Sequence, residues 1–445
     1  MSTLGKPLLS HFPFPATSIN INNGSFGSYP TQIRDALNSY QQQTDAEPDI
    51  FIRYKLPALI DRSRAAVASL INARSVDDVV LVPNVTTGVN TILWNLSLNF
   101  SAGDKIVYLG TTYGSCEKII DFIGEYSSSV EAVRVDIQYP ISKAAILQKF
   151  QHAISQPGVR VTLFDTVSSM PAFCLPCEEM VALCRQYNVL SLVDGAHGIG
   201  CIPLDMQRLD ADFFGRWLFM PRSCAALHIP ARNQHLIRSS LPTSHGYIPI
   251  HKPGKPVIKN PLPVSKNPAF VQLFEFVGTL DYTPYLCVPD ALRYRQEICG
   301  GEEVIMRYCI DLAQRGSELV AQMLGTEVLG EQWQRECPMA MVRLPIDNVS
   351  GLSETRQAEI GPWIEKEGAE VHGFFAPVIL HNENLLVRLS AQVYLTLQDF
   401  ESVGRALVIS AVGLLMRDTH CALWTLDSGL WTLDPGLRKW SHVEQ

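Results

Sequence analysis

The feature that most constrains the fold is an alternation of short apolar runs with longer amphipathic runs between residues 76 and about 230. The amphipathic runs carry apolar residues three and four positions apart, as an amphipathic helix does. The apolar runs are rich in Val, Leu and Ile and lie within 76–84, 105–110, 130–136, 160–166 and 189–196. Strands that alternate with helices predict an α/β fold, with a doubly wound, mostly parallel sheet covered by helices on both faces.

The remaining chain is predicted to form further units. Residues 251–268 are rich in Pro and Lys and lack periodicity, which is typical of a connector. Between about 300 and 412, helical patterns mix with short strands such as 339–345 and 384–390, which predicts a smaller α+β domain. We therefore expect an N-terminal segment, a large domain, a small C-terminal domain and a tail of unknown role, at residues 1–25, 26–290, 291–412 and 413–445. The tail contains LWTLDSG followed directly by LWTLDPG.

Composition argues against several classes of partner. The net charge is -8, and no long run of one sign occurs, which argues against a nucleic-acid partner. The longest apolar stretch, 406–416, is too short to span a bilayer and is interpreted as a buried helix. No signal peptide is visible, and 11 cysteines scattered through a large chain indicate free thiols, so a cytoplasmic location is expected. Cys174 and Cys177 lack the two further ligands that zinc needs, so no metal site is expected.

Polar residues follow two of the predicted strands, at the sheet edge where ligands bind in such folds. Residues 84–88 (NVTTG) precede a helix, so they can bind a phosphate through N–H groups and hydroxyls; the alternative is an ordinary N-cap formed by a threonine. Asp194 follows an apolar run, and a buried carboxylate needs a cation or donors. A protonated pyridinium is one such partner, with His197 close enough to bond a phenolic oxygen of the same ring. The alternative is that Asp194 caps the next turn.

Two more residues are candidates for ligand contacts. Tyr113, after the strand KIVYL, can stack on a ring, although a tyrosine at a strand end is often simply packed. Arg388 lies within an apolar strand of the small domain. A guanidinium there requires a bidentate anion, which is either a substrate carboxylate or a structural ion-pair partner.

Taken together, these motifs resemble those of the class V aminotransferase-fold enzymes that use pyridoxal 5'-phosphate (PLP). The chain is most similar to their isopenicillin N epimerase-like branch, which includes cysteine-sulfoxide lyases. The resemblance covers about 18–410 and depends on INNGSFGSYP, VPNVTTGVNTIL, DTVSSMPAFCLP, VDGAHGIG, FVGTLDYTPYLCVPDALRYR and VRLSAQVY, in that order. It implies PLP fold type I, a homodimer, and the conversion of an amino acid by a C–S lyase, epimerase or aminotransferase reaction, with a role in fungal secondary or sulfur metabolism.

The resemblance also implies roles for individual cofactor-binding residues. Thr86 and Thr87 match the phosphate ligands, and Tyr113 matches the residue that stacks on the ring. Asp194 matches the partner of the pyridine nitrogen, and His197 matches the neighbour of the ring oxygen.

Further roles follow from the same resemblance. Ser168 matches a position near the cofactor, and Gly278 with Thr279 matches a loop that reaches the phosphate of the partner subunit. Arg388 matches the residue that binds the substrate carboxylate. Asn23 lies in the N-terminal segment that lines the substrate pocket of the family.

The chain departs from the family at the position of the lysine that forms the Schiff base with PLP. Relatives have a His-Lys-Trp triplet after a strand like DFF, whereas this chain reads DFFGRWLF and lacks about four residues. Gly215 replaces the histidine, and Arg216 stands at the lysine position. A guanidinium stays protonated, so Arg216 does not replace the lysine. Lys252, Lys255 and Lys259 follow in the connector.

Three interpretations of this departure stay open. The sequence records an altered gene model or splice form of a PLP enzyme, or the chain is a pseudoenzyme with a binding or regulatory role, or PLP binds without a covalent bond and residual chemistry persists. The first is the interpretation we favour from the sequence, because the flanking residues are intact.

Overall fold

A seven-stranded sheet forms the centre of the computed structural model, which describes residues 4–126, 130–217, 220–250, 254, 256, 258–346, 349–418, 430–434 and 439–443. The strand order is β1-β7-β6-β5-β4-β2-β3. The strands are β1 (Val79–Val82), β2 (Lys105–Leu109), β3 (Glu131–Val135), β4 (Val159–Asp165), β5 (Leu190–Asp194), β6 (Phe213–Trp217) and β7 (Ala225–His228). Only β7 runs antiparallel to its neighbours, β1 and β6. The predicted doubly wound, mostly parallel sheet is therefore confirmed.

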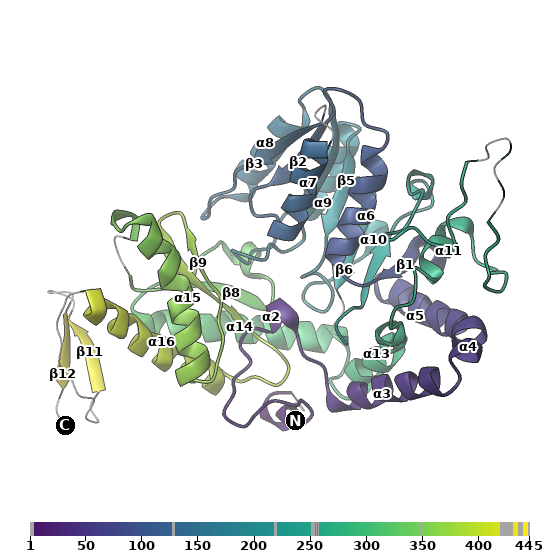
Figure 1. The fold of residues 1–445 in the computed structure, drawn as a ribbon. Coiled ribbons are helices and arrows are strands. Elements are labelled where there is room, and N and C mark those ends of the chain that lie inside the picture. The colour runs from purple at the N-terminus through teal and green to yellow at the C-terminus, as the bar shows by residue number, and fades with distance from the viewer. Residues whose placement is uncertain are drawn as a thin grey trace.

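Helices cover both faces of this sheet (Figure 1). On one face, α6 (Val85–Ser97) and α7 (Gly114–Tyr126) bury apolar side chains such as Ile92 and Ile120 against the strands. On the other face, α5 (Leu56–Leu70), α8 (Lys143–Ile154) and α9 (Cys177–Gln186) contribute to a second core that includes Phe150 and Phe164. Burial on both faces explains why the central strands read as continuous apolar runs rather than as alternating ones.

A second, antiparallel sheet lies beside the first. It has the order β8-β10-β9, with β8 (Met339–Arg343), β9 (Val378–His381) and β10 (Asn384–Ser390). The strands predicted at 339–345 and 384–390 correspond to β8 and β10. Long helices pack on this sheet and on one another: α14 (Glu302–Leu324), α15 (Glu354–Val371) and α16 (Leu397–Asp418). The stretch 406–416 belongs to α16.

The remaining helices are mostly short. They are α1 (Lys6–Leu9), α2 (Asn23–Phe26), α3 (Thr31–Ala46), α4 (Pro48–Ile50), α10 (Met206–Leu209), α11 (Ala269–Glu275), α12 (Thr283–Leu286) and α13 (Val288–Glu297). A hairpin of β11 (Leu430–Asp434) and β12 (Lys439–Val443) lies at the left of Figure 1 and includes the second LWTLD copy. The first copy, at 423–429, lies outside the described residues. Among the helices that are described, none has the length and apolar character needed to cross a membrane.

The N-terminal segment crosses from the outside of the small sheet to the large one. Gly5 N–H donates to the carbonyl of Val393 at 2.7 Å, and the carbonyl of Ile21 accepts from Ser390 N–H at 2.8 Å. These contacts hold α2 beside the end of β10, so the residues of α2 meet the carboxyl ends of the large sheet's strands.

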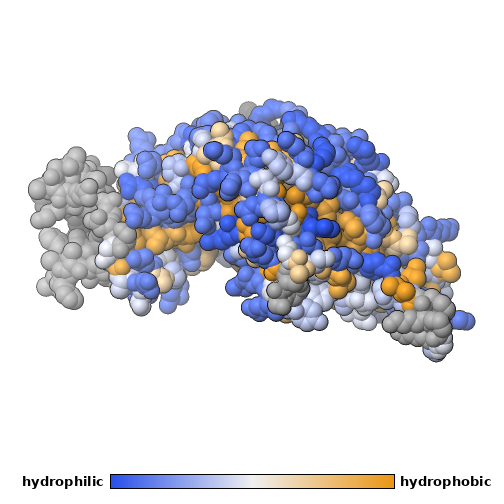
Figure 2. Space-filling view, turned by 90° about the horizontal axis from the view of Figure 1, so that it is seen from above, coloured by the Kyte–Doolittle hydropathy of each residue, from blue (hydrophilic) through white to orange (hydrophobic). Residues whose placement is uncertain are grey.

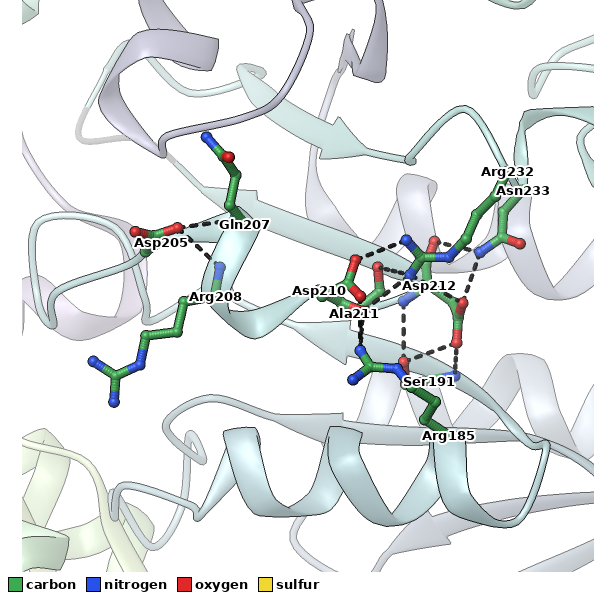
Figure 3. Close-up of polar contacts among 10 residues, drawn as sticks. All are labelled: Arg185, Ser191, Asp205, Gln207, Arg208, Asp210, Ala211, Asp212, Arg232 and Asn233. Carbon is green, nitrogen blue, oxygen red and sulfur yellow. Dashed lines mark hydrogen bonds and ion pairs between the residues drawn. The ribbon is translucent and has the colours of Figure 1, made fainter.

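A polar network fixes the opposite edge of the sheet, where β5 and β6 begin (Figure 3). The carboxylate of Asp212 accepts from Ser191 N–H at 3.0 Å, from Asn233 Nδ2 at 2.8 Å and from Arg232 Nη2 at 3.3 Å. Arg232 Nη1 also donates to Asp210 at 2.7 Å. Asp212 therefore ties the start of β6 to β5 and to the loop after β7, and in this way it sets the register of the strand that carries position 216.

Asp212→Ala is expected to lower the free energy of unfolding by about 1–3 kcal/mol, because several buried or half-buried donors lose their shared acceptor. Urea unfolding measures the change. Asp49→Ala is the matched control, because the Asp49 side chain is 84% exposed and pairs with Arg53 within a helical turn. Equal effects of the two substitutions would contradict the structural role of the network.

Candidate active site

A cavity of about 520 Å³ opens at the carboxyl ends of the large sheet's strands. Its walls come from α2, from the start of α6, from the tips of β4 and β5, and from the loop between β6 and β7. This is the edge at which open α/β sheets bind ligands. Of the residues selected from the sequence, Thr86, Tyr113, Asp194 and His197 line this cavity.

Asp194 is the last residue of β5, and only 3% of its surface is exposed. Its Oδ1 accepts from Ala196 N–H at 2.8 Å, and its Oδ2 accepts from the Cys116 thiol at 3.6 Å. The cap of the following turn is thus present, but no Lys or Arg side chain of the described part lies within ion-pair distance. Burial raises the pKa of Asp194 to about 6, and the Ala196 N–H and the Cys116 thiol limit the rise. A ligand cation at this carboxylate would therefore be stabilising.

Gly195 shapes the turn after Asp194. A Cβ at Gly195 would lie 2.2 Å from Cζ of Phe214, so only glycine fits there. Gly195 N–H bonds the carbonyl of Gly215 at 2.5 Å, which joins the tip of β5 to β6.

His197 is partly buried on the cavity wall. Burial lowers its pKa, and the positive charge of Arg388 contributes a smaller part, so that together they bring it to about 3. The imidazole is therefore neutral at physiological pH, and one ring nitrogen donates a hydrogen bond while the other accepts one. This suits a contact with a ring oxygen and makes His197 a weak base.

The start of α6 provides donors for an anion. Asn84 is the N-cap: its Oδ1 accepts from Thr87 N–H at 2.8 Å and from Thr87 Oγ1 at 3.0 Å. The N-cap alternative is thus present, but the capping residue is Asn84 rather than a threonine. Thr86 lines the cavity, whereas the Thr87 hydroxyl is turned toward Asn84. The first N–H groups of any α-helix lack intrahelical partners and attract anions.

Tyr113 and Thr279 lie in very different surroundings. Tyr113 precedes α7, is 49% exposed and lines the cavity, so its ring face is accessible to a ligand. Thr279 is exposed in the loop before α12 and is not part of the cavity wall of its own chain. Its predicted contact with a partner subunit stays a prediction.

Arg388 lies on β10 and is 1% exposed. Its Nη1 donates to the carbonyl of Ser169 at 2.8 Å, and its Nη2 donates to Asn22 Oδ1 at 2.9 Å and to Ser25 Oγ at 2.7 Å. Its Nε is buried without a hydrogen bond. Burial lowers the pKa of Arg388 to about 10, so it stays charged at neutral pH. No carboxylate of the described residues pairs with it, so the structural ion pair considered from the sequence is not seen there.

Asn23 and Ser168 are buried beside the cavity rather than on its wall. Asn23 Oδ1 accepts from the hydroxyl of Tyr394 at 3.3 Å, whereas its neighbours Gly24 and Ser25 line the cavity. Ser168 Oγ donates to the carbonyl of Pro171 at 2.6 Å and closes its own loop. In that loop it is Ser169 that lines the cavity.

Position 216 lies on β6. The backbone of Arg216 pairs with Ala226 of β7. The preceding residue, Gly215, pairs with Asp194 of β5. The side chain of Arg216 lies outside the described part of the chain. Lys252 and Lys255 also lie outside the described residues, and Lys259 is exposed. The described residues that line the cavity include no lysine.

Sequence reasoning missed three residues of this site. Asp165, at the tip of β4, follows an apolar run just as Asp194 does, so the same signal was present. Ser169 stands next to Ser168, which was selected. Arg222 lines the cavity from the loop after β6, and no sequence pattern singled it out.

The arrangement can now be compared with known proteins. The family model described as "Aminotransferase class-V" matches residues 30–215, and its match ends one residue before Arg216. The chain is 34% identical to the L-cysteine desulfhydrase-like protein lolT1 of Epichloe uncinata, over 93% of this chain and 97% of the relative. This chain belongs to the aminotransferase class V family. The family and the type of enzyme expected from the sequence, a PLP-dependent one, are thereby confirmed.

Two further similarities agree with this assignment. Hercynylcysteine sulfoxide lyase of Schizosaccharomyces pombe is 28% identical, over 91% of this chain and 97% of the relative. Among solved structures, a lysine-to-alanine mutant of C-DES with glycine covalently linked to the PLP cofactor aligns with a TM-score of 0.69 at 20% identity, over 90% of this chain and 98% of the other. The second similarity shows that the fold is shared.

The residues present fit PLP in part. At Asp194 a buried carboxylate that has no cation among the described side chains faces the cavity, and the start of α6 offers N–H donors for a phosphate. A neutral imidazole and an exposed phenol ring lie nearby. These residues suit the pyridine nitrogen, the phosphate, the ring oxygen and the ring face, and the attachment lysine is the part that does not match.

Proposed function

We propose that this protein is a PLP-dependent enzyme that cleaves a carbon–sulfur bond in an amino acid. The observation that carries the proposal is a pair of buried, opposite charges beside one cavity, with Asp194 on its wall and Arg388 behind the lining residues Ser25 and Ser169. Asp194 is a carboxylate without a described cation, and Arg388 is a guanidinium without a described carboxylate. A ligand that brings a pyridinium and a carboxylate complements both charges.

Each of these residues binds a different part of the cofactor or of the substrate. Asp194 holds the ring nitrogen in its charged form, and the start of α6 with Thr86 holds the phosphate. Tyr113 packs on the ring, and the neutral His197 bonds the ring oxygen. Arg388 orients the carboxylate of the amino acid, for which Asn22 and Ser25 must yield their hydrogen bonds. When bound, PLP supplies an electron sink for the bond that is broken at the substrate.

The choice of a C–S lyase reaction depends on the relatives, which include a desulfhydrase-like protein and a sulfoxide lyase. An arginine at position 216 supports the further proposal that PLP is held without a covalent bond to the chain. The mutant of C-DES holds PLP although one lysine is gone. Without a lysine to move protons, we expect turnover about 10²–10⁴-fold slower than in an enzyme that has one.

The test is an assay of the PLP-loaded protein with cysteine and cysteine S-conjugates, in which the released sulfur compound and the 2-oxo acid are both measured. We expect slow release of both products, and no release from Asp194→Ala, which loses the ring partner. PLP binding without product from any of these substrates would contradict the proposed reaction.

Arg216 also favours a second candidate function, a binding protein of the same fold. In that case PLP or an amino acid would be bound and not converted. The same assay separates the two candidates, because a binding protein gives saturable binding and no product.

We further propose that the protein is a homodimer. Hydrophobic side chains reach the surface among hydrophilic ones (Figure 2), and Ile258 and Val264 are 82% and 97% exposed. The segment that carries them borders a groove of about 540 Å³. Sedimentation velocity measures the mass, and a monomer at micromolar concentration would contradict this proposal.

A further inference from the structure

Asp165 is a second buried carboxylate beside Asp194. It ends β4, as Asp194 ends β5, and the two residues are direct partners in the register of these parallel strands. Each is 3% exposed, and both line the cavity. Side chains in register on parallel strands lie on the same face of the sheet, so the two carboxyl groups are neighbours.

The surroundings of Asp165 contain acids but no cation among the described side chains. Its Oδ2 is buried without a hydrogen-bond partner. The groups that face it are Asp194 from β5, Cys116 from α7, Cys177 from α9 and Tyr139 from the loop after β3. Cys177 donates to the main-chain carbonyl of Asp165 at 3.1 Å and not to its carboxyl group.

Two neighbouring buried carboxyl groups cannot both ionise at low cost, so the pair retains a proton. The hydrogen bonds show which group retains it. Asp194 accepts from the Ala196 N–H and the Cys116 thiol, which stabilise its ionised form. The Asp165 carboxyl has a hydrogen bond only from its own backbone N–H among the described groups, and its Oδ2 accepts from nothing. Burial raises the pKa of Asp165 well above its usual range, and the charge of Asp194 adds to the rise.

We infer that Asp165 is a positioning residue that holds the proton of this pair, so that Asp194 alone carries the single negative charge of the site. The pair then complements a ring nitrogen with one positive charge and rejects a divalent cation, which would need both groups ionised. The inference rests on the proposed function in naming a pyridinium as the ligand. The protonation of Asp165 itself does not depend on PLP.

Infrared difference spectroscopy of the protein without PLP tests the protonation directly. The C=O stretching band of a protonated carboxylic acid is expected at pH 7.5 in the parent and is expected to disappear in Asp165→Asn. Asp399→Asn is the matched control, because Asp399 is also buried but pairs with Lys6 at 2.5 Å, so it should not change the band. Asp165→Ser replaces Asp165→Asn if the latter does not fold. A spectrum without a band that depends on Asp165 would overturn the inference.

PLP titration gives a second, independent readout. Asparagine resembles a protonated aspartate, so Asp165→Asn should bind PLP within about threefold of the parent, whereas Asp194→Asn should bind it roughly 30-fold or more weakly. An equal loss of PLP affinity in Asp165→Asn and Asp194→Asn would overturn the inference. If the parent itself does not bind PLP, the proposed function fails, and the infrared result still decides the protonation of Asp165.

Discussion

Asp194→Asn is expected to stabilise the protein without cofactor and, at the same time, to weaken its binding of PLP roughly 30-fold or more. Burial holds the pKa of Asp194 near 6 in the folded chain, above the ordinary value of 3.8. A group whose pKa is raised by folding gives its full stability below pH 4 and loses it as the pH rises through 6. Asparagine does not ionise, so the variant should be more stable by on the order of 2–3 kcal/mol at neutral pH.

Urea unfolding between pH 4 and pH 8 measures this gain. The free energy of unfolding of the variant should exceed that of the parent by the whole expected amount above pH 7. This excess should shrink below pH 6 and vanish near pH 4. The opposite pH dependence would mean that Asp194 is ionised at a net benefit in the folded chain, through a cation that the described residues do not provide.

The loss of PLP affinity in the same variant has a separate cause. Removing the buried carboxylate that pairs with the pyridinium weakens the binding free energy of PLP by about 2–5 kcal/mol. This corresponds to roughly a 30-fold or greater rise in Kd. Spectral titration measures it, and Asp399→Asn serves as a control for the loss of a buried carboxylate elsewhere. A variant that is more stable but binds PLP as the parent does would refute the assignment of Asp194.

Arg388→Gln is expected to remove the preference of the protein for a free amino acid over the corresponding carboxamide. The guanidinium is buried, charged and held only by neutral acceptors, among them Asn22 and Ser25. A carboxylate gains a charge-assisted, bidentate bond there, and an amide does not. The preference of the parent should be at least about 30-fold and should fall to near unity in the variant, because truncating a buried charge contact costs about 2–5 kcal/mol.

A competition experiment, in which a free amino acid and the corresponding carboxamide compete for the PLP-loaded protein, measures this preference. PLP affinity should stay unchanged, because Arg388 lies behind Ser25 and Ser169 rather than at the ring site. Arg388→Lys should retain part of the preference, because lysine offers a point charge without the planar fork. A variant that prefers the free acid as strongly as the parent would exclude Arg388 as the carboxylate site.

The sheet could be predicted from the sequence because its strands are apolar along their whole length and alternate with amphipathic helices. Asp194 could be found for a related reason, since a carboxylate directly after such a strand lies at the ligand-binding edge. Asp165 carries the same signal and was missed, because its loop was interpreted through Ser168. The loop folds back on itself through the bridge of Val167 with Cys174, so the neighbouring Ser169 faces the cavity instead.

Other parts of the site depend on contacts that local patterns do not reveal. Arg388 is held by Asn22, which is 366 residues away in the chain. The turn of the Thr87 hydroxyl toward Asn84 depends on which residue caps α6, and threonine and asparagine are both common caps. Such choices are decided by tertiary packing and are therefore visible only in the folded chain.

The most direct test of this account is a PLP titration of the purified protein, followed by borohydride reduction and peptide mass mapping. We predict saturable binding that is lost in Asp194→Ala, with no PLP adduct on any lysine after reduction. An adduct on a lysine would show that the attachment site has moved and that the cofactor is covalently held. The absence of any PLP binding would contradict the proposed function itself.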